Sequence, residues 1–376
     1  MRQEGADDPA VVVTAISLTG FRNLADAKLE IPRSGAVLIG ENGHGKTNFL
    51  EALYYLQLLR SFRGALDVDV VGFGADGFHL GAAVETGAGS TTLSIGFERS
   101  SRRKKATMDG KKPPRLSDAF GHAPTVMFSP RDAQLVSGGP SERRRYIDIM
   151  LAATSRRYLH ALHSYRLALQ QRNSALRAAM RGAGSEAEVE VWEPAMAEHG
   201  AILVDTRAEW SALRAGEFGE LCAEIGETAG TTLRYRARLA GTGDTRAALA
   251  ESLAEHRAID LRRGLTHTGP HRDELVLELG GREMREFASA GQQRTGAIAL
   301  RMLEAATLRE RCGAKPVLLL DDPFAELDSR RSAAILALLA SSGFGQTVLC
   351  VPKAEEIPVE LSRVQRWSIR AGVITR

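Results

Sequence analysis

The chain has 376 residues, a formal net charge of +3 and 44% hydrophobic residues, which suffice for one large domain with an insertion or for two domains. No stretch approaches ~18 consecutive apolar residues, so the sequence predicts no membrane-spanning helix. The three cysteines, Cys222, Cys312 and Cys350, form no C-x-x-C pair, which argues against a zinc site and against a disulfide framework. Residues 1–10 are polar and acidic, as is typical of a flexible tail and not of a signal peptide.

The first predicted strands, near 11–18 and 36–39, lead into a glycine-rich loop of the pattern G-x-x-x-x-G-K-[ST]. Glycines let backbone N–H groups approach phosphate oxygens, and the helix predicted from NFLEALYYLQLL points its N-terminus at the same phosphates. Lys46 can reach the β- and γ-phosphates, and Thr47 can ligate Mg²⁺. A turn without a ligand is disfavoured by the complete motif. The predicted nucleotide-binding residues are Gly40, Glu41, Asn42, Gly43, His44, Gly45, Lys46, Thr47 and Asn48.

A basic segment follows the strands predicted near 80–85 and 91–98, before another near 125–128. Residues 99–115 contain eight Lys or Arg against one Asp, and Asp109-Gly110 predicts a turn at the apex of a hairpin. Basic clusters mark contacts with phosphate backbones, although a solvated hairpin tip has the same composition. The candidate nucleic-acid contacts are Lys104, Lys105, Lys111 and Lys112.

Residues 129–262 are predicted to form an inserted helical lobe. Apolar residues at helical spacing predict one helix over 141–181, ~60 Å long at 1.5 Å per residue. An acidic segment at 186–228 is also compatible with a helix, and residues 181–185 suit a turn between the two. Residues 143–181 hold nine Arg against one Asp. The sequence therefore predicts a short antiparallel arm in which the acidic helix neutralises much of the charge of the basic one.

The chain then returns to the α/β lobe, with a strand predicted over 275–279. Ser289 stands at the N-cap position of a strong helix former, with Gly291 and Gln292 in its first turn. This is a second helix terminus suited to phosphate, and an ordinary capped helix is an equal alternative for this segment alone.

Two carboxylates follow the apolar run Val317–Leu320, which predicts a buried parallel strand. At its carboxyl end Asp321 is expected to hold Mg²⁺, and Asp322 to orient an attacking water, with Glu326 as the alternative. Since aspartate is one methylene shorter than glutamate, we expect slow hydrolysis, with Lys46, Asp321 and Asp322 as the catalytic residues. A helix is expected over 329–340, and strands near 346–351 and 366–374. Cys350 stands where ABC-type ATPases, which the order of these motifs resembles, usually have a polar switch residue.

The order of P-loop, S-x-G-Q and paired carboxylates resembles ABC-type ATPases, and more closely the RecF family of DNA-repair proteins. The motifs that carry this resemblance extend from about residue 16 to residue 330, and they are SLTGFRNL (17–24), GENGHGKTNFLEALYYL (40–56), RSFRG (60–64), FSPRDAQLVSGGPSERRRYID (128–148), YRLALQQRN (165–173), GPHRDEL (269–275), ASAGQQR (288–294) and LLLDDPFAELD (318–328).

This resemblance implies an α/β ATPase lobe of the ABC type, formed by residues 11–128 and 263–376, with the short helical lobe inserted at 129–262. It implies a cytoplasmic, nucleoid-associated protein that binds ATP and Mg²⁺, dimerises on ATP to clamp DNA at gaps, and acts with RecO and RecR to load RecA. Slow, DNA-responsive hydrolysis would then reset the clamp. The alternative is a soluble ABC-type ATPase for another partner, such as a transporter subunit or another nucleotide-driven switch.

Overall fold

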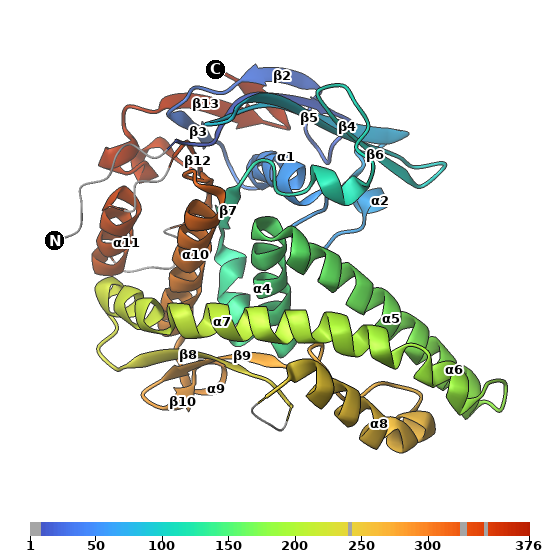
Figure 1. Cartoon of the computed structure of the whole chain (residues 1–376). Coiled ribbons are helices and arrows are strands. Elements are labelled where there is room, and N and C mark those ends of the chain that lie inside the picture. Colours follow the sequence, from blue (N-terminus) through green and yellow to red (C-terminus); the bar gives the residue numbers. More distant parts are fainter. Residues whose placement is uncertain (1–8, 240–242, 324–328, 342–344) are drawn as a thin grey trace. The chain divides into compact units, whose positions relative to one another are not determined.

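The computed structural model describes residues 9–239, 243–323, 329–341 and 345–376. It divides into two compact units, one made of Met1–Asp132 and Leu300–Arg376 and the other of Ala133–Ala299. Figure 1 names the helices and strands of both units. Within the described ranges, no helix combines the length and the apolar character that crossing a bilayer requires.

A six-stranded sheet forms the centre of the first unit. The strand order is β14-β13-β3-β12-β11-β7. Adjacent strands run parallel, except that β14 is antiparallel to β13. The central strands β11 and β12 are buried along their whole length and are mostly apolar, as expected for parallel strands covered on both faces. The strands are β3 (Gly35–Ile39), β7 (Thr125–Phe128), β11 (Val317–Asp321), β12 (Thr347–Val351), β13 (Gln365–Arg370) and β14 (Val373–Thr375).

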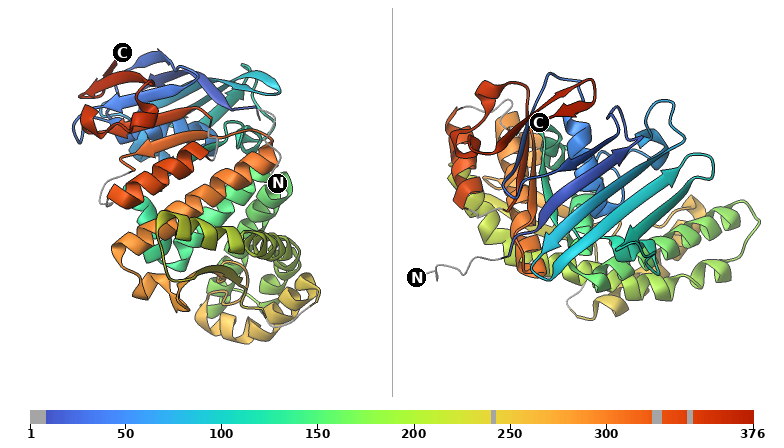
Figure 2. Two further views of the ribbon diagram at one scale, coloured as in Figure 1. Left: turned by 90° about the vertical axis from the view of Figure 1, so that its left-hand side faces the viewer. Right: turned by 90° about the horizontal axis from the view of Figure 1, so that it is seen from above.

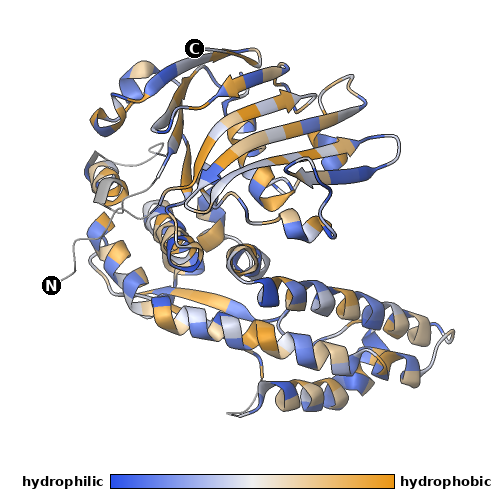
Figure 3. Cartoon of the chain, turned by 45° about the horizontal axis from the view of Figure 1, so that its top comes forward, coloured by the Kyte–Doolittle hydropathy of each residue, from blue (hydrophilic) through white to orange (hydrophobic). Residues whose placement is uncertain are grey.

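An antiparallel sheet of order β2-β1-β4-β5-β6 completes the first unit. Buried and exposed residues alternate along β4 and β5, as expected for strands with one face in the core, and Figure 3 shows the matching alternation of hydropathy. The right-hand view of Figure 2 shows these strands side by side. They are β1 (Val12–Thr19), β2 (Ala27–Glu30), β4 (Gly77–Thr86), β5 (Gly89–Glu98) and β6 (Arg103–Met108).

Helix α1 (Lys46–Leu58) contacts strands of both sheets and is buried on almost every side. Tyr55 illustrates this packing, because its ring meets Phe21 and Phe78 edge-on with centroids 5.9 and 5.3 Å apart. The other helices that lie wholly in this unit are α2 (Asp67–Val70), α11 (Ser329–Ser341), η1 (Leu116–Ala119), η3 (Ala354–Glu356) and η4 (Val359–Leu361), while η2 (Pro130–Ala133) lies at its boundary.

The predicted basic hairpin is present, but its apex is not where the sequence suggested. Strands β5 and β6 are joined through residues 99–102. Asp109 and Gly110 form a separate two-residue turn with φ angles of 49° and 72°. Met108 and Lys111 exchange backbone hydrogen bonds of 2.8 and 2.9 Å across it. The turn chemistry was therefore predicted correctly, and the strand that precedes it, β6, was missed.

The second unit combines helices with the small antiparallel sheet β10-β9-β8. Helix α10 begins in this unit and continues into the first. The elements of the second unit are α3 (Gln134–Ser137), α4 (Pro140–Thr154), α5 (Arg156–Met180), α6 (Glu186–Glu190), α7 (Glu193–Ile225), β8 (Thr231–Arg236), α8 (Thr245–Arg263), β9 (Glu274–Leu279), β10 (Arg282–Glu283), α9 (Met284–Phe287) and the first part of α10 (Ala290–Cys312).

The single helix predicted over 141–181 is wrong, because Ser155 separates α4 from α5. Its backbone is extended, with φ −144° and ψ 113°, and its hydroxyl accepts a hydrogen bond from the Tyr158 N–H at 3.2 Å. A serine that caps a following helix competes with continuation of the preceding one. The apolar periodicity of the sequence alone does not reveal this break between the helices.

The antiparallel pairing of α5 with α7 is as predicted, and a buried ion pair and a buried hydrogen bond join the two helices. Arg172 of α5 donates to Glu193 of α7 at 2.8 Å, and Arg207 of α7 donates to the Tyr158 hydroxyl at 3.0 Å. Arg207 also binds Asp148 of α4 at 2.7 Å. Each segment therefore neutralises charge on the other: Glu193 of the acidic segment binds Arg172 of the basic one, and Arg207 of the acidic segment binds Asp148 of the basic one.

Two motifs without an assigned role, at 165–173 and 269–275, meet inside this unit. The Tyr165 hydroxyl lies 2.7 Å from His271 Nδ1, while His271 Nε2 lies 3.2 Å from the Thr266 carbonyl oxygen. A carbonyl only accepts, so Nε2 carries the proton and Nδ1 accepts from Tyr165. Burial lowers the pKa of His271 to about 4. These motifs therefore build the core of the helical unit.

The expected domain boundary near 262 also needs correction. Strand β9 pairs with β8, Glu274 opposite Arg236, and β8 contacts α7. The compact helical unit consequently extends to Ala299, and it contains the strand at 274–279 and the start of α10. The sequence did not predict β8 or α8.

Candidate functional site

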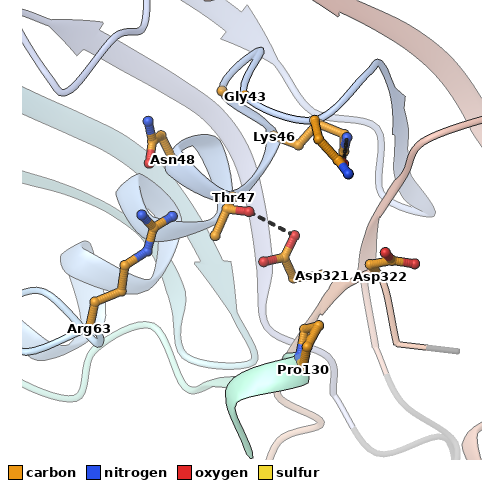
Figure 4. Close-up of a pocket in the computed structure, with 10 residues that line it drawn as sticks. Gly43, Lys46, Thr47, Asn48, Arg63, Pro130, Asp321 and Asp322 are labelled. Atoms are coloured by element: carbon orange, nitrogen blue, oxygen red, sulfur yellow. Dashed lines mark hydrogen bonds between the residues drawn. The ribbon is translucent and has the colours of Figure 1, made fainter. Parts of the chain in front are cut away.

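A cavity of about 340 Å³ lies at the carboxyl edge of the parallel sheet (Figure 4). Ligands of open α/β sheets bind at this edge, and the volume suits a small ligand. The described residues that line it come from the P-loop, from α1 and the loop after it, from η2 and from the end of β11, and they are Asn42, Gly43, Gly45, Lys46, Thr47, Asn48, Arg63, Pro130, Asp321 and Asp322.

The loop before α1 depends on its glycines. Gly43 and Gly45 have φ angles of 85° and 108°, in the left-handed region that favours glycine. A Cβ atom on Gly40 would lie 2.5 Å from the carbonyl oxygen of Ile369 in β13. The loop can therefore close tightly around an anion at the N-terminus of α1.

The Lys46 ammonium group is held inside this loop. It donates to the carbonyl oxygen of Gly40, to that of Glu41 at 3.0 Å and to Asn42 Oδ1 at 3.4 Å. The side chain is 7% exposed. One cation is thus enclosed by backbone dipoles at the cavity wall, where phosphate oxygens would replace the carbonyl contacts.

Thr47 and Asp321 are brought together although 274 positions separate them in sequence. The Thr47 hydroxyl donates to Asp321 Oδ1 at 3.0 Å, as Figure 4 shows. Burial raises the pKa of the Asp321 carboxyl, and the Thr47 hydrogen bond and the Arg63 charge oppose that rise. A hydroxyl beside a buried carboxylate at the cavity fits Mg²⁺, which binds one or two protein oxygens and otherwise phosphates and water.

Asp322 also faces the cavity, from an unusual backbone conformation. Its φ is 47°, and its N–H donates to the Cys350 carbonyl oxygen at 3.0 Å. Aspartate and asparagine are the non-glycine residues that best tolerate this left-handed region. The backbone turn therefore directs the second carboxylate away from the strand, while Glu326 lies outside the described residues.

Cys350, which occupies the position expected for a polar switch, is not among the cavity-lining residues. It pairs with Asp321 in the sheet, and its thiol donates to the Lys46 carbonyl oxygen at 3.6 Å. Burial raises the pKa of the Cys350 thiol well above its usual value. The thiol is therefore a protonated core group behind the P-loop.

Segments distant in sequence hold the P-loop in place, and sequence reasoning missed them. Asn23 donates to the Gly43 carbonyl oxygen at 3.2 Å and accepts from the Asn48 amide at 2.7 Å. His44 Nδ1 accepts from the Ala371 N–H at 2.9 Å. The side chains of Asn48 and His44 thus have partners within the protein, and the Glu41 side chain is 90% exposed. The motif SLTGFRNL contained Asn23 but indicated no role for it.

Arg63 is the charged lining residue to which the sequence assigned no role. Its Nε lies 3.7 Å from Oε2 of Glu51, which is fully buried and also binds Arg22 through two hydrogen bonds of 3.0 Å. Burial lowers the pKa of Arg63, and Glu51 opposes this. Two arginines therefore share one carboxylate, and the second of them lines the cavity. Arg63 belongs to the motif RSFRG, which was the one indication in the sequence that this residue has a function.

The segment around Ser289 forms a capping box at the start of α10. The Ser289 hydroxyl accepts from the Gln292 N–H at 3.3 Å, and Gln292 Oε1 accepts from the Ser289 N–H at 2.9 Å. Gly291 lies between them in the first turn, where N–H groups have no intrahelical partner. The predicted N-cap is confirmed, and Ser289 is exposed.

The four predicted nucleic-acid lysines do not share one environment. Lys105, Lys111 and Lys112 are exposed. Lys104 lies on the inner face of β6, with its side chain 15% exposed and its ammonium 2.6 Å from Asp67 Oδ2. It also donates to the Leu59 carbonyl oxygen at 2.7 Å. Lys104 is therefore engaged within the protein, and the expectation of a phosphate contact needs correction for this residue.

The fold and the cavity define an ABC-type P-loop ATPase with an inserted helical unit. The family model described as "RecF/RecN/SMC N terminal domain" matches residues 12–366. The chain belongs to the RecF family of DNA replication and repair proteins. It is 36% identical to the DNA replication and repair protein RecF of Geobacter sulfurreducens, over 87% of this chain and 89% of that protein. It is 33% identical to RecF of Moorella thermoacetica, over 97% of this chain and 96% of that protein.

Solved structures agree with this assignment. The recombination mediator protein RecF with ATP, of the RecFOR pathway, superimposes with a TM-score of 0.89 at 28% identity, covering 100% of this chain and 99% of the other. An Smc head bound to a domain of ScpA has a TM-score of 0.53 at 13% identity, covering 96% of each chain, and shows a common fold.

Proposed function

We propose that the cavity binds ATP with Mg²⁺. The P-loop from Gly40 to Thr47 would hold the phosphates, with Lys46 as the cation, and Thr47 and Asp321 would hold the metal. Bound Mg²⁺ supplies charge neutralisation at the phosphate oxygens. Asp322 would orient a water for slow hydrolysis, and Arg63 would place a second positive charge beside the phosphates. The observation that carries this proposal is the Thr47–Asp321 contact at the cavity wall.

We further propose that ATP joins two copies of the chain. The P-loop belongs to one compact unit, and the capped start of α10, with Ser289, Gly291 and Gln292, belongs to the other. In ABC-type relatives the second terminus faces the γ-phosphate held by the partner subunit. Because ADP lacks that phosphate, only ATP has the differential contact that shifts the monomer–dimer equilibrium.

Sedimentation velocity with each nucleotide tests the dimer. The wild-type chain is expected to be monomeric with ADP and dimeric with ATP and Mg²⁺. Ser289→Arg introduces a bulky cation at the interface and should weaken dimerisation by at least ~10-fold, while monomer ATP binding stays unchanged. A wild-type chain that stays monomeric at saturating ATP, with and without DNA, would remove the clamp from this proposal.

DNA is the partner proposed for the dimer, bound at gaps through phosphates. The exposed lysines Lys105, Lys111 and Lys112 support this, as does the relatives' description as DNA replication and repair proteins. The solved structures described as members of the RecFOR pathway support RecO and RecR as protein partners. Loading of RecA at gaps in the cytoplasm would be the outcome, with hydrolysis responding to DNA and resetting the clamp.

A further inference from the structure

A buried carboxylate contacts the capping box at the start of α10. Glu227 Oε2 accepts a hydrogen bond from the Gln292 side-chain nitrogen at 3.2 Å, and Glu227 is 7% exposed. The same Gln292 side chain accepts from the Ser289 N–H through its oxygen. Gln292 thus bridges the carboxylate and the N-cap residue.

The end of α7 fixes the position of this carboxylate. Gly226 adopts φ 120°, its N–H donates to the Ala223 carbonyl oxygen at 3.0 Å, and the Glu227 N–H donates to the Cys222 carbonyl oxygen at 3.0 Å. This is the Schellman geometry, which reverses the chain immediately after a helix. The backbone of Glu227 is therefore fixed by hydrogen bonds that Gly226 and Glu227 donate to the last turn of α7.

The chemistry of a carboxylate selects one orientation of the Gln292 amide. A carboxylate only accepts, so it draws the NH₂ group toward itself and leaves the carbonyl oxygen facing the Ser289 N–H. In the opposite orientation two oxygens would face each other, and two donors would meet at the N-cap. With the capping box closed, the Ser289 hydroxyl accepts from Gln292 and keeps its own proton to donate to an anion.

We propose that Glu227 is a positioning residue for the Ser289–Gln292 capping box, and that it prepares this helix terminus to receive the γ-phosphate of the ATP bound by the partner copy. This inference rests on the proposed ATP-dependent dimer. Glu227 acts through Gln292 and does not touch the nucleotide.

Dimerisation of three variants, measured by sedimentation velocity with ATP and Mg²⁺, tests the proposal. Glu227→Ala should weaken the dimer at least ~10-fold, because it removes a hydrogen bond to a charged group, while ATP binding by the monomer stays unchanged. Glu227→Gln keeps an acceptor and should restore dimerisation to within ~3-fold. Glu224→Ala removes an exposed carboxylate from the last turn of α7 and should match the wild type.

A double-mutant cycle separates positioning from simple destabilisation. Glu227→Ala should have no further effect on the dimer when Gln292 is already alanine. Effects of the two substitutions that multiply, or a Glu227→Ala dimer as tight as the wild type, would overturn the proposal.

Hydrogen exchange of the unliganded chain provides a readout that does not need the dimer. Glu227→Ala should speed exchange of the Ser289 amide, because the capping box loses its orientation, and Glu224→Ala should not. Unchanged exchange refutes the positioning role even if the wild type dimerises. Faster exchange in a chain that never dimerises upholds the contact and contradicts the proposed function.

Discussion

At the scale of single residues, the site combines a cation enclosed by carbonyl dipoles with two carboxylates in different environments. Asp321 is buried and bound to Thr47, whereas Asp322 leaves the strand through a left-handed backbone. One carboxylate is suited to a metal and the other to water because the chain changes direction between them.

Lys46→Ala should weaken ATP binding by roughly 10- to 100-fold, since it removes a charge-assisted contact to the phosphates. Equilibrium titration with a fluorescent ATP analogue measures the change. Lys315→Ala, a change just before the amino end of β11 and not among the cavity-lining residues, serves as the comparison. Equal affinities for the Lys46 variant and the wild type would contradict the site.

Asp322→Asn should retain ATP and Mg²⁺ binding but reduce steady-state hydrolysis by ~100-fold or more, because the amide does not accept a proton from water. Asparagine tolerates φ near 47° as aspartate does, so the backbone turn is kept. Turnover measured with saturating ATP provides the check. Hydrolysis at the wild-type rate would assign the water to another group, with Glu326 as the next candidate.

At the scale of secondary-structure elements, strand period and helix caps decide which charges are available. β6 alternates its side chains, so Lys104 joins the buried face opposite Phe97 while Lys105 faces outward. Ser155 similarly ends α4 and starts α5 with one hydroxyl. Two adjacent residues of the same type, such as Lys104 and Lys105, therefore have different surroundings.

Replacing Lys105, Lys111 and Lys112 with alanine should weaken DNA binding and reduce its salt dependence by ~0.9 log units of slope per lost phosphate contact. Fluorescence anisotropy of duplex DNA at several salt concentrations gives this slope. Lys104→Ala should instead lower the thermal stability, because it leaves Asp67 without its ammonium partner, and should leave the slope unchanged. An identical slope for the triple variant would assign the three lysines to a solvated surface.

At the scale of the whole molecule, the chain passes twice between its two units, and α10 contains residues of both. Buried polar groups stabilise the helical unit, notably Arg172 with Asp260 at 2.7 Å and Tyr165 with His271 at 2.7 Å. Such groups make its stability sensitive to protonation.

Folding stability should decline as the pH falls from about 6.5 to about 4, in part through His271. Its pKa is lowered to about 4 in the folded chain, so the unfolded chain binds the extra proton in this window. The contribution is at most about 3 kcal/mol. His271→Asn should flatten urea-unfolding stability against pH relative to His163→Asn, an exposed control. Equal pH dependence in the two variants would exclude His271 as the titrating group.

The sequence by itself determined the order of the motifs, the strands at 35–39 and 317–321, the helix that follows the P-loop and the capped start of α10. These features depend on local pattern: apolar runs, glycine spacing and capping residues. Tertiary structure alone decided that Asn23 binds the P-loop, that Arg63 lines the cavity, that Lys104 pairs with Asp67, and that Glu227 faces Gln292. Each of these arrangements brings together groups from separate segments, so burial and partner choice follow from packing, which periodicity along one segment does not encode.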